Sequence, residues 1–159
     1  MTTEPSKQGP HSRDLRRGRV SIPGQIYLVT TITAARAPLF AELGIGRILV
    51  QTMRNHQQSG AVDSLAYVIM PDHLHWLFAL GEGRSLSWVI GQTKRYSAQN
   101  INQIRGTKGQ AVWQDGFHDR AIRREEDLKG VARYIIANPV RAGRVSRVGD
   151  YPLWDASWL

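Results

Sequence analysis

The sequence of 159 residues contains no cysteine and no long apolar run. Without cysteine, disulfide bonds and thiolate zinc sites are excluded. No stretch approaches the roughly 20 consecutive apolar residues that a membrane span needs. The first residues also lack the apolar segment of a secretory signal. We therefore expect a cytoplasmic location and no membrane partner.

Several signatures of catalysis are missing as well. The chain has no glycine-rich phosphate loop and no GxSxG turn, and its 13 acidic residues are too scattered to suggest a pair of catalytic carboxylates. Because cysteine is absent, a nucleophilic side chain would have to be tyrosine, serine, threonine or lysine.

Positive charge is concentrated in one part of the chain, which carries a net charge of +8 overall. Residues 84–147 hold 13 basic and five acidic side chains, whereas residues 20–83 are almost neutral. The basic region also contains five aromatic residues. Arginines interleaved with aromatic rings suit phosphate contact and base stacking, although a solvated basic surface would show the same counts.

Hydrophobic periodicity predicts a small α+β domain. Strands are expected over residues 25–33, 64–70 and 73–80, with a further short strand within 111–122, and helices over 41–57, 85–104 and 125–138. Acidic residues at 125–127 would begin the last helix, and Pro139 would stop it. The order begins as the βαββαβ pattern of a ferredoxin-like sandwich, an antiparallel sheet with helices packed on one face. Residues 1–19 are predicted to form a flexible basic arm, and residues 20–159 a single domain.

Two histidines are candidates for metal binding. His73 and His75 lie one residue apart in a predicted strand, so both side chains project from the same face. Leu74 and Trp76 would then face the core. Two converging imidazoles can chelate a divalent cation, but two histidines on a half-exposed face would have the same spacing. The three other histidines have no such geometry and are predicted to be surface residues: His11, His56 and His118.

The last predicted helix carries a candidate nucleophile. Its apolar stripe contains Leu128, Val131, Ala132, Ile135 and Ile136. Tyr134 and Asn138 fall outside the centre of that stripe on the same side and are four residues apart, so a phenol and an amide would project near one another. The alternative is a tyrosine at the edge of the core and an asparagine that ends a helix.

Three motifs give the chain a recognisable resemblance. They are MPDHLHWLFAL at 70–80, WQDGFHDRAI at 113–122 and YIIANPVRAG at 134–143, in this order. With them the chain resembles the REP-associated tyrosine transposases, a branch of the single-tyrosine HUH transposases that act on single-stranded DNA. The resemblance extends from about Arg16 to the C-terminus.

The resemblance implies a ferredoxin-like catalytic domain with an additional C-terminal helix that carries the nucleophile. It assigns that role to Tyr134, with Tyr96 as the second choice. It further implies that His73, His75 and Asn138 hold Mg²⁺ or Mn²⁺. The expected reaction is metal-dependent nicking and joining of single-stranded DNA through a covalent 5′-phosphotyrosine.

The expected partner is DNA folded into palindromic hairpins, and the protein would be nucleoid-associated, as a monomer or a homodimer. The candidate DNA-binding residues are Arg13, Arg16, Arg17, Arg19, Lys94, Arg95, Arg120, Arg123, Arg124, Arg133, Arg141 and Arg144. Two other functions remain open at this stage. One is a catalytically inactive protein that binds hairpins, and the other is a metal-dependent nuclease in which water attacks the phosphate.

Overall fold

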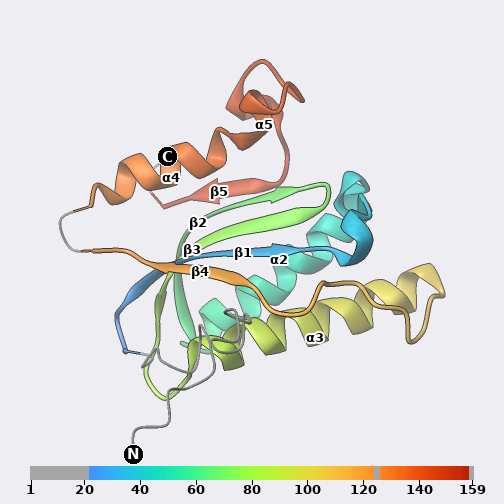
Figure 1. Cartoon of the computed structure of the whole chain (residues 1–159), viewed down its shortest axis with the longest axis horizontal. Helices are drawn as coiled ribbons and strands as arrows, with labels where there is room; N and C mark the ends of the chain where they lie inside the picture. Colours follow the sequence, from blue (N-terminus) through green and yellow to red (C-terminus); the bar gives the residue numbers. More distant parts are fainter. Residues whose placement is uncertain (1–21, 124–125, 158–159) are drawn as a thin grey trace, which may run out of the picture.

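A five-stranded antiparallel sheet forms the centre of the computed structural model, which describes residues 22–123 and 126–157 (Figure 1). Its strand order is β4-β1-β3-β2-β5. The strands are β1 (Ile26–Ile32), β2 (Val62–Met70), β3 (His73–Leu80), β4 (His118–Ala121) and β5 (Trp154–Ala156). The sequence predicted the first four of these strands and missed β5, which pairs with β2.

The sheet is centred on the hairpin formed by β2 and β3. Only Pro71 and Asp72 separate the two strands, which pair from Met70 and His73 outward. The other edge of β3 pairs with β1, and β1 in turn pairs with β4. The two histidines of β3 therefore lie in the middle of the sheet, with strands on both sides.

Helices α2 (Leu43–Gln58) and α3 (Leu86–Arg105) cover one face of the sheet (Figure 1). The Ser85 hydroxyl caps α3 by accepting from the backbone N–H of Trp88 at 3.0 Å. Gly106 ends this helix in the left-handed region, with φ at 67°. Leu74 and Trp76 face the core, as predicted, and the alternate residues of β3 all pack beneath the helices: Leu74, Trp76, Phe78 and Leu80.

Helix α4 (Leu128–Ile136) packs on the opposite face, so the expectation of helices on one face holds only for α2 and α3. Ala132, Ile135 and Ile136 of α4 are buried against residues of β2 and β3, and Leu128 and Val131 border them. The predicted apolar stripe is thereby confirmed. Each strand of the central hairpin consequently contributes to two apolar clusters, one on each face.

Both predicted ends of the last helix are wrong. Helix α4 begins only at Leu128, because Glu126 binds Arg120 (2.7 Å) and the backbone N–H of Arg123 instead of entering a first turn. Pro139 does not stop a helix; it lies in the first turn of the short helix α5 (Asn138–Arg141). Proline is favoured there because its missing N–H would be unpaired in any case.

One histidine is not where the sequence predicted. His56, in the last turn of α2, is only 6% exposed, with its ring against Trp76 and Trp88.

Short 3₁₀ helices η1 (Ala34–Arg36), η2 (Leu39–Ala41) and η3 (Val148–Asp150) complete the described structure. None of the described helices is long and apolar enough to cross a membrane.

Candidate active site

The imidazoles of His73 and His75 contact one another on the face of the sheet that α4 covers. Their ring centroids are 4.8 Å apart and the rings are nearly perpendicular. Both residues are partly buried, because α4 covers the β2 side of this face and leaves the end of β3 open. The same-face prediction is confirmed.

Each histidine is oriented by a hydrogen bond at its Nδ1 atom. His73 Nδ1 lies 2.7 Å from Asp72 Oδ1, and Asp72 also binds Arg36 at 3.2 Å. His75 Nδ1 lies 2.8 Å from the hydroxyl of Thr30, its partner across the sheet on β1. With both Nδ1 atoms engaged, the Nε2 atoms are the ones left to bind a cation. Metal-binding histidines in proteins are commonly held in this way.

The pKa shifts of Asp72 and His75 agree with hydrogen bonding at Nδ1 of each histidine and a free Nε2 atom. Partial burial raises the pKa of Asp72, but the hydrogen bonds and charges of His73 and Arg36 outweigh it and hold the pKa below its usual value. An ionised carboxylate can only accept, so His73 Nδ1 carries the proton. Burial, followed by the charges of His73 and Arg141, lowers the pKa of His75 to about 4. His75 is therefore neutral at pH 7, as a metal ligand must be.

Tyr134 lies on the exposed side of α4 and is held by Arg141 of α5. The Tyr134 side chain is 66% exposed, and the Cζ atom of Arg141 lies 3.9 Å from the centre of its ring. Arg141 also donates a hydrogen bond to the Asn138 side-chain oxygen at a distance of 2.5 Å. One guanidinium thus joins the candidate nucleophile to the candidate third ligand.

The charge of Arg141 also contributes, after burial and the charge of His73, to the lowered pKa of His75. Helix α5 packs on β2, next to β3. The structure therefore gathers Tyr134, Asn138 and Arg141 on the same side of the sheet as His73 and His75. The sequence predicts Arg141 only as a DNA contact, and no sequence pattern indicates a role for Asp72 or Thr30.

The donor set fits a divalent cation with two imidazoles and an amide oxygen. Within residues 22–123 and 126–157, no group of three or more histidine, aspartate or glutamate side chains could hold a metal. Asn138, the third ligand that the resemblance implies, offers a neutral amide oxygen. The Asn138 amide oxygen accepts a hydrogen bond from Arg141. To bind a cation, this oxygen would have to exchange that hydrogen bond for a bond to the metal.

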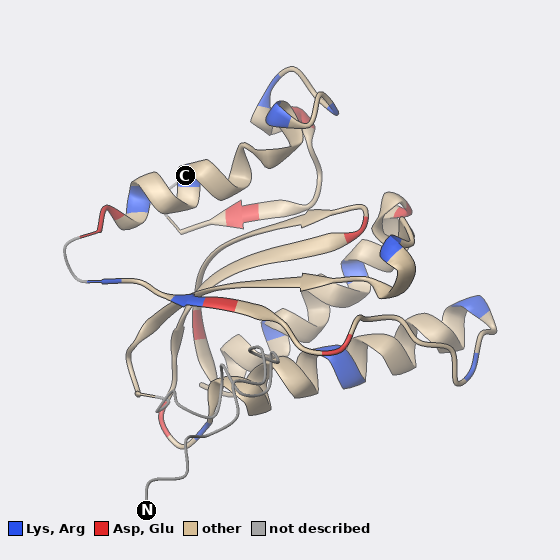
Figure 2. Ribbon diagram, viewed as in Figure 1, with Lys and Arg blue, Asp and Glu red and all other residues tan. Residues whose placement is uncertain are grey.

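The candidate DNA-binding residues that the structure describes do not form one surface. Arg120, Arg133, Arg141 and Arg144 belong to β4, α4, α5 and the segment after it, whereas Lys94 and Arg95 lie on α3, on the other face of the sheet (Figure 2). Lys94 is half-buried, and its ammonium donates to the backbone carbonyls of Gln114 and Gly116. The remaining candidates except Arg123 lie outside the described residues: Arg13, Arg16, Arg17, Arg19 and Arg124.

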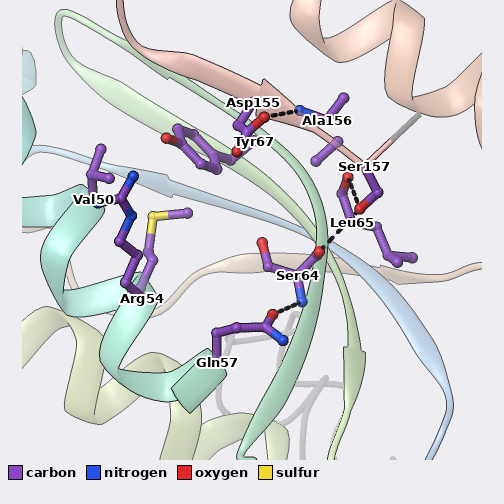
Figure 3. A pocket seen from close by; sticks show the side chains of 11 residues that line it. Val50, Arg54, Gln57, Ser64, Leu65, Tyr67, Asp155, Ala156 and Ser157 are labelled. Carbon is purple, nitrogen blue, oxygen red and sulfur yellow. Dashed lines mark hydrogen bonds between the residues drawn. The ribbon is translucent and has the colours of Figure 1, made fainter. Parts of the chain in front are cut away.

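Two further features lie away from this site. Tyr96, the second-choice nucleophile, is 50% exposed on α3 and so belongs to the opposite face from His73. A pocket of about 180 Å³ lies between α2 and the β2–β5 edge (Figure 3). Its polar lining includes Arg54, Tyr67 and Asp155, and none of the predicted site residues lines it.

Known proteins similar to this chain identify its family. The profile of a family described as "Transposase IS200 like" matches residues 22–138, which include the histidine pair, Tyr134 and Asn138. The chain belongs to this family. The predicted resemblance to REP-associated tyrosine transposases is confirmed too, since the Escherichia coli K12 protein of that name is 33% identical over 90 residues, covering 55% of this chain and 50% of the relative.

Solved structures of other proteins agree with this family membership. The structure of a REP-associated tyrosine transposase bound to a REP hairpin has a TM-score of 0.69 and 26% identity, and the match covers 86% of this chain and 79% of that one. A Deinococcus radiodurans protein has a TM-score of 0.55 at 17% identity, with 74% of this chain and 93% of that one covered, which shows likeness of fold.

A curated relative from Haemophilus influenzae is 29% identical over 99 residues, covering 57% of this chain and 56% of the relative. This chain spans about half the length of the two curated relatives.

Proposed function

We propose that this family member nicks and rejoins single-stranded DNA that carries palindromic hairpins, with Tyr134 as the nucleophile. The observation that supports the proposal is that Arg141 contacts both Tyr134 and Asn138, on the face of the sheet that carries the histidine pair. The likeness to a transposase bound to a REP hairpin supports DNA hairpins as the substrate.

In the proposed reaction, the phenolic oxygen of Tyr134 attacks the scissile phosphorus and forms a 5′-phosphotyrosine, while the upstream strand leaves with a 3′-hydroxyl. The phosphodiester energy is kept in the new bond, so a second 3′-hydroxyl can reverse the attack and join strands without a nucleotide cofactor. Arg141 orients the phenol through its contact with the ring.

His73, His75 and Asn138 are proposed to hold Mg²⁺ or Mn²⁺. A cation bound there would withdraw charge from a non-bridging oxygen of the scissile phosphate. Asp72 and Thr30 orient the imidazoles for this role. Because all three proposed ligands are neutral, the charge of the cation stays available for the anionic substrate.

The test is covalent capture of DNA. The full chain is incubated with Mn²⁺ and a 3′-labelled single-stranded oligonucleotide containing a palindromic hairpin from its own genomic neighbourhood, and the products are separated on a denaturing gel. We expect the label to migrate with the protein, and to do so for Tyr96→Phe but not for Tyr134→Phe.

Tyr96→Phe is the matched control, because it removes a phenol of similar exposure from the opposite face of the sheet. Binding without any covalent product would favour an inactive hairpin-binding protein. Free cleaved DNA without an adduct would favour a nuclease that uses water. An adduct that persists in Tyr134→Phe would overturn the assignment of the nucleophile.

A further inference from the structure

His118 lies on the same face of the sheet as the histidine pair. Thr30 of β1 is the cross-strand partner of His75 on β3 and also of His118 on β4. Cross-strand partners project from the same face, so His75, Thr30 and His118 form one row. Since neighbouring strands are about 4.8 Å apart, the backbones of the two histidines are about 10 Å apart. His118 is exposed, as the sequence predicted, but it is exposed next to the candidate active site.

The loop that leads into β4 is anchored at several points. Trp113 Nε1 donates to the Ser97 hydroxyl at 3.0 Å, and the backbone N–H of Gln114 donates to the Ile32 carbonyl at 2.9 Å. Lys94 of α3 donates to two further carbonyls of this loop. His118 therefore follows a segment tied to both β1 and α3, and such support is what a precisely placed functional group requires.

A small cavity of about 70 Å³ lies between this loop and β1. Its lining includes Thr30, Ile32, Gln114, Phe117 and His118. Thr30 and Ile32 are the partners of His75 and His73 in the sheet. Neither histidine lines the cavity, which lies one strand away from the pair, between β1 and the segment that ends at His118.

Tyr134 lies on a helix over the other half of the sheet. Its helix packs over β2 and β5, whereas β1 and β4 lie beyond β3 on the other side. In a phosphoryl transfer, the attacking and leaving oxygens lie roughly in line on opposite sides of the phosphorus. A phosphate placed at His73 and His75 and attacked by Tyr134 from the β2 side would direct its leaving oxygen toward β1, the cavity and His118.

We propose that the DNA strand that leaves with the 3′-hydroxyl lies along the β1 and β4 side of the histidine pair, with its 3′-oxygen at this cavity, and that His118 donates the proton to that leaving oxygen. This inference rests on the function proposed above. As the Tyr134 oxygen bonds to phosphorus and the P–O3′ bond breaks, the phenolic proton passes to water and the His118 imidazolium proton passes to O3′. In the joining step, the neutral imidazole takes the proton of the attacking 3′-hydroxyl. Histidine suits both directions because its imidazolium can donate a proton and its neutral imidazole can accept one.

The experiment compares two oligonucleotides that differ in one bridging atom. In the first, the scissile linkage is normal; in the second, sulfur replaces O3′. A thiol has a pKa near ~8.5, so a thiolate leaves without needing a proton. The rate of adduct formation is measured with Mn²⁺ for the wild type, His118→Ala and His118→Gln. Asp119→Asn is the matched control, since it removes an ionisable group from the next residue of β4, whose cross-strand partner Val29 belongs to the other face.

We expect both His118 variants to form the adduct on the order of 100-fold more slowly than the wild type with the normal linkage. With the sulfur linkage they should match the wild type within a few-fold, and Asp119→Asn should match it with both substrates. Equal slowing with both substrates, or no slowing with either, would overturn the inference while the Tyr134 adduct still stood. If the wild type forms no adduct that depends on Tyr134, the proposed function fails, and this inference fails with it.

Discussion

The guanidinium of Arg141 lies over the ring of Tyr134, with its Cζ atom 3.9 Å from the ring centre. The same group donates to the amide oxygen of Asn138. A planar guanidinium can stack on a ring and donate a directed hydrogen bond at the same time, whereas the ammonium of lysine is a compact point charge. Arg141 therefore combines two contacts that fix the position of a side chain 66% exposed to solvent.

Replacing Arg141 by lysine should slow catalysis without weakening DNA binding. The charge remains, but the stacked ring and the bond to Asn138 lose their geometry, so we expect the rate constant for adduct formation at saturating DNA to fall about 10- to 100-fold. Hairpin affinity and melting temperature should change little. Single-turnover kinetics and a binding titration measure the two effects separately.

Arg147→Lys is the control for that substitution, because Arg147 is an exposed arginine paired with Asp150 at 3.4 Å. It should leave the rate constant unchanged. A matching loss of hairpin affinity in Arg141→Lys would show that Arg141 acts as a DNA contact and does not position Tyr134.

Removing the Thr30 hydroxyl should weaken metal binding. Thr30→Val deletes the group 2.8 Å from His75 Nδ1 and keeps the shape of the side chain. Loss of such an orienting partner typically costs 10- to 100-fold in metal affinity. Titration of Mn²⁺ followed by electron paramagnetic resonance measures the change without DNA.

Thr31→Val provides the comparison from the next residue of β1. The Thr31 hydroxyl is buried on the other face and has no hydrogen-bond partner among the described residues. Its removal should leave Mn²⁺ affinity unchanged and should keep or slightly raise stability, because an unpaired buried hydroxyl is unfavourable. Equal Mn²⁺ affinity in the two variants would argue against orientation of His75 by Thr30.

The buried ring of His56 should make stability fall in mild acid. Burial lowers its pKa from the usual 6.5, so the unfolded chain takes up a proton more readily than the folded one. Its contribution to stability is complete above pH 6.5 and is lost as the pH falls from there toward the folded pKa. Compared with the wild type, His56→Phe should therefore lose less stability between pH 7 and pH 5 in urea unfolding. A constant difference between the two proteins across that range would contradict this.

Local periodicity was enough to predict most of the elements. A strand's period of two predicted that His73 and His75 share a face, and the helical angle placed Tyr134 outside the apolar stripe; both are observed. The ends of α4 were missed because Glu126 binds Arg120 and because proline fits a first helical turn as well as a stop. The burial of His56 was missed because it depends on Trp76 and Trp88, which lie on other elements.

The sequence by itself determined the strand that carries the histidines, the helix that carries the tyrosine and the motifs that identify the family, because these depend on spacing along the chain. Only the tertiary structure decided which residues meet at the site. Thr30 reaches His75, and His118 joins their row, through the register of strands distant in sequence. Arg141 reaches Tyr134 because the short helix α5 follows α4 and carries its guanidinium over that ring. Strand register and helix placement follow from the burial of both faces of the sheet, which no local pattern encodes.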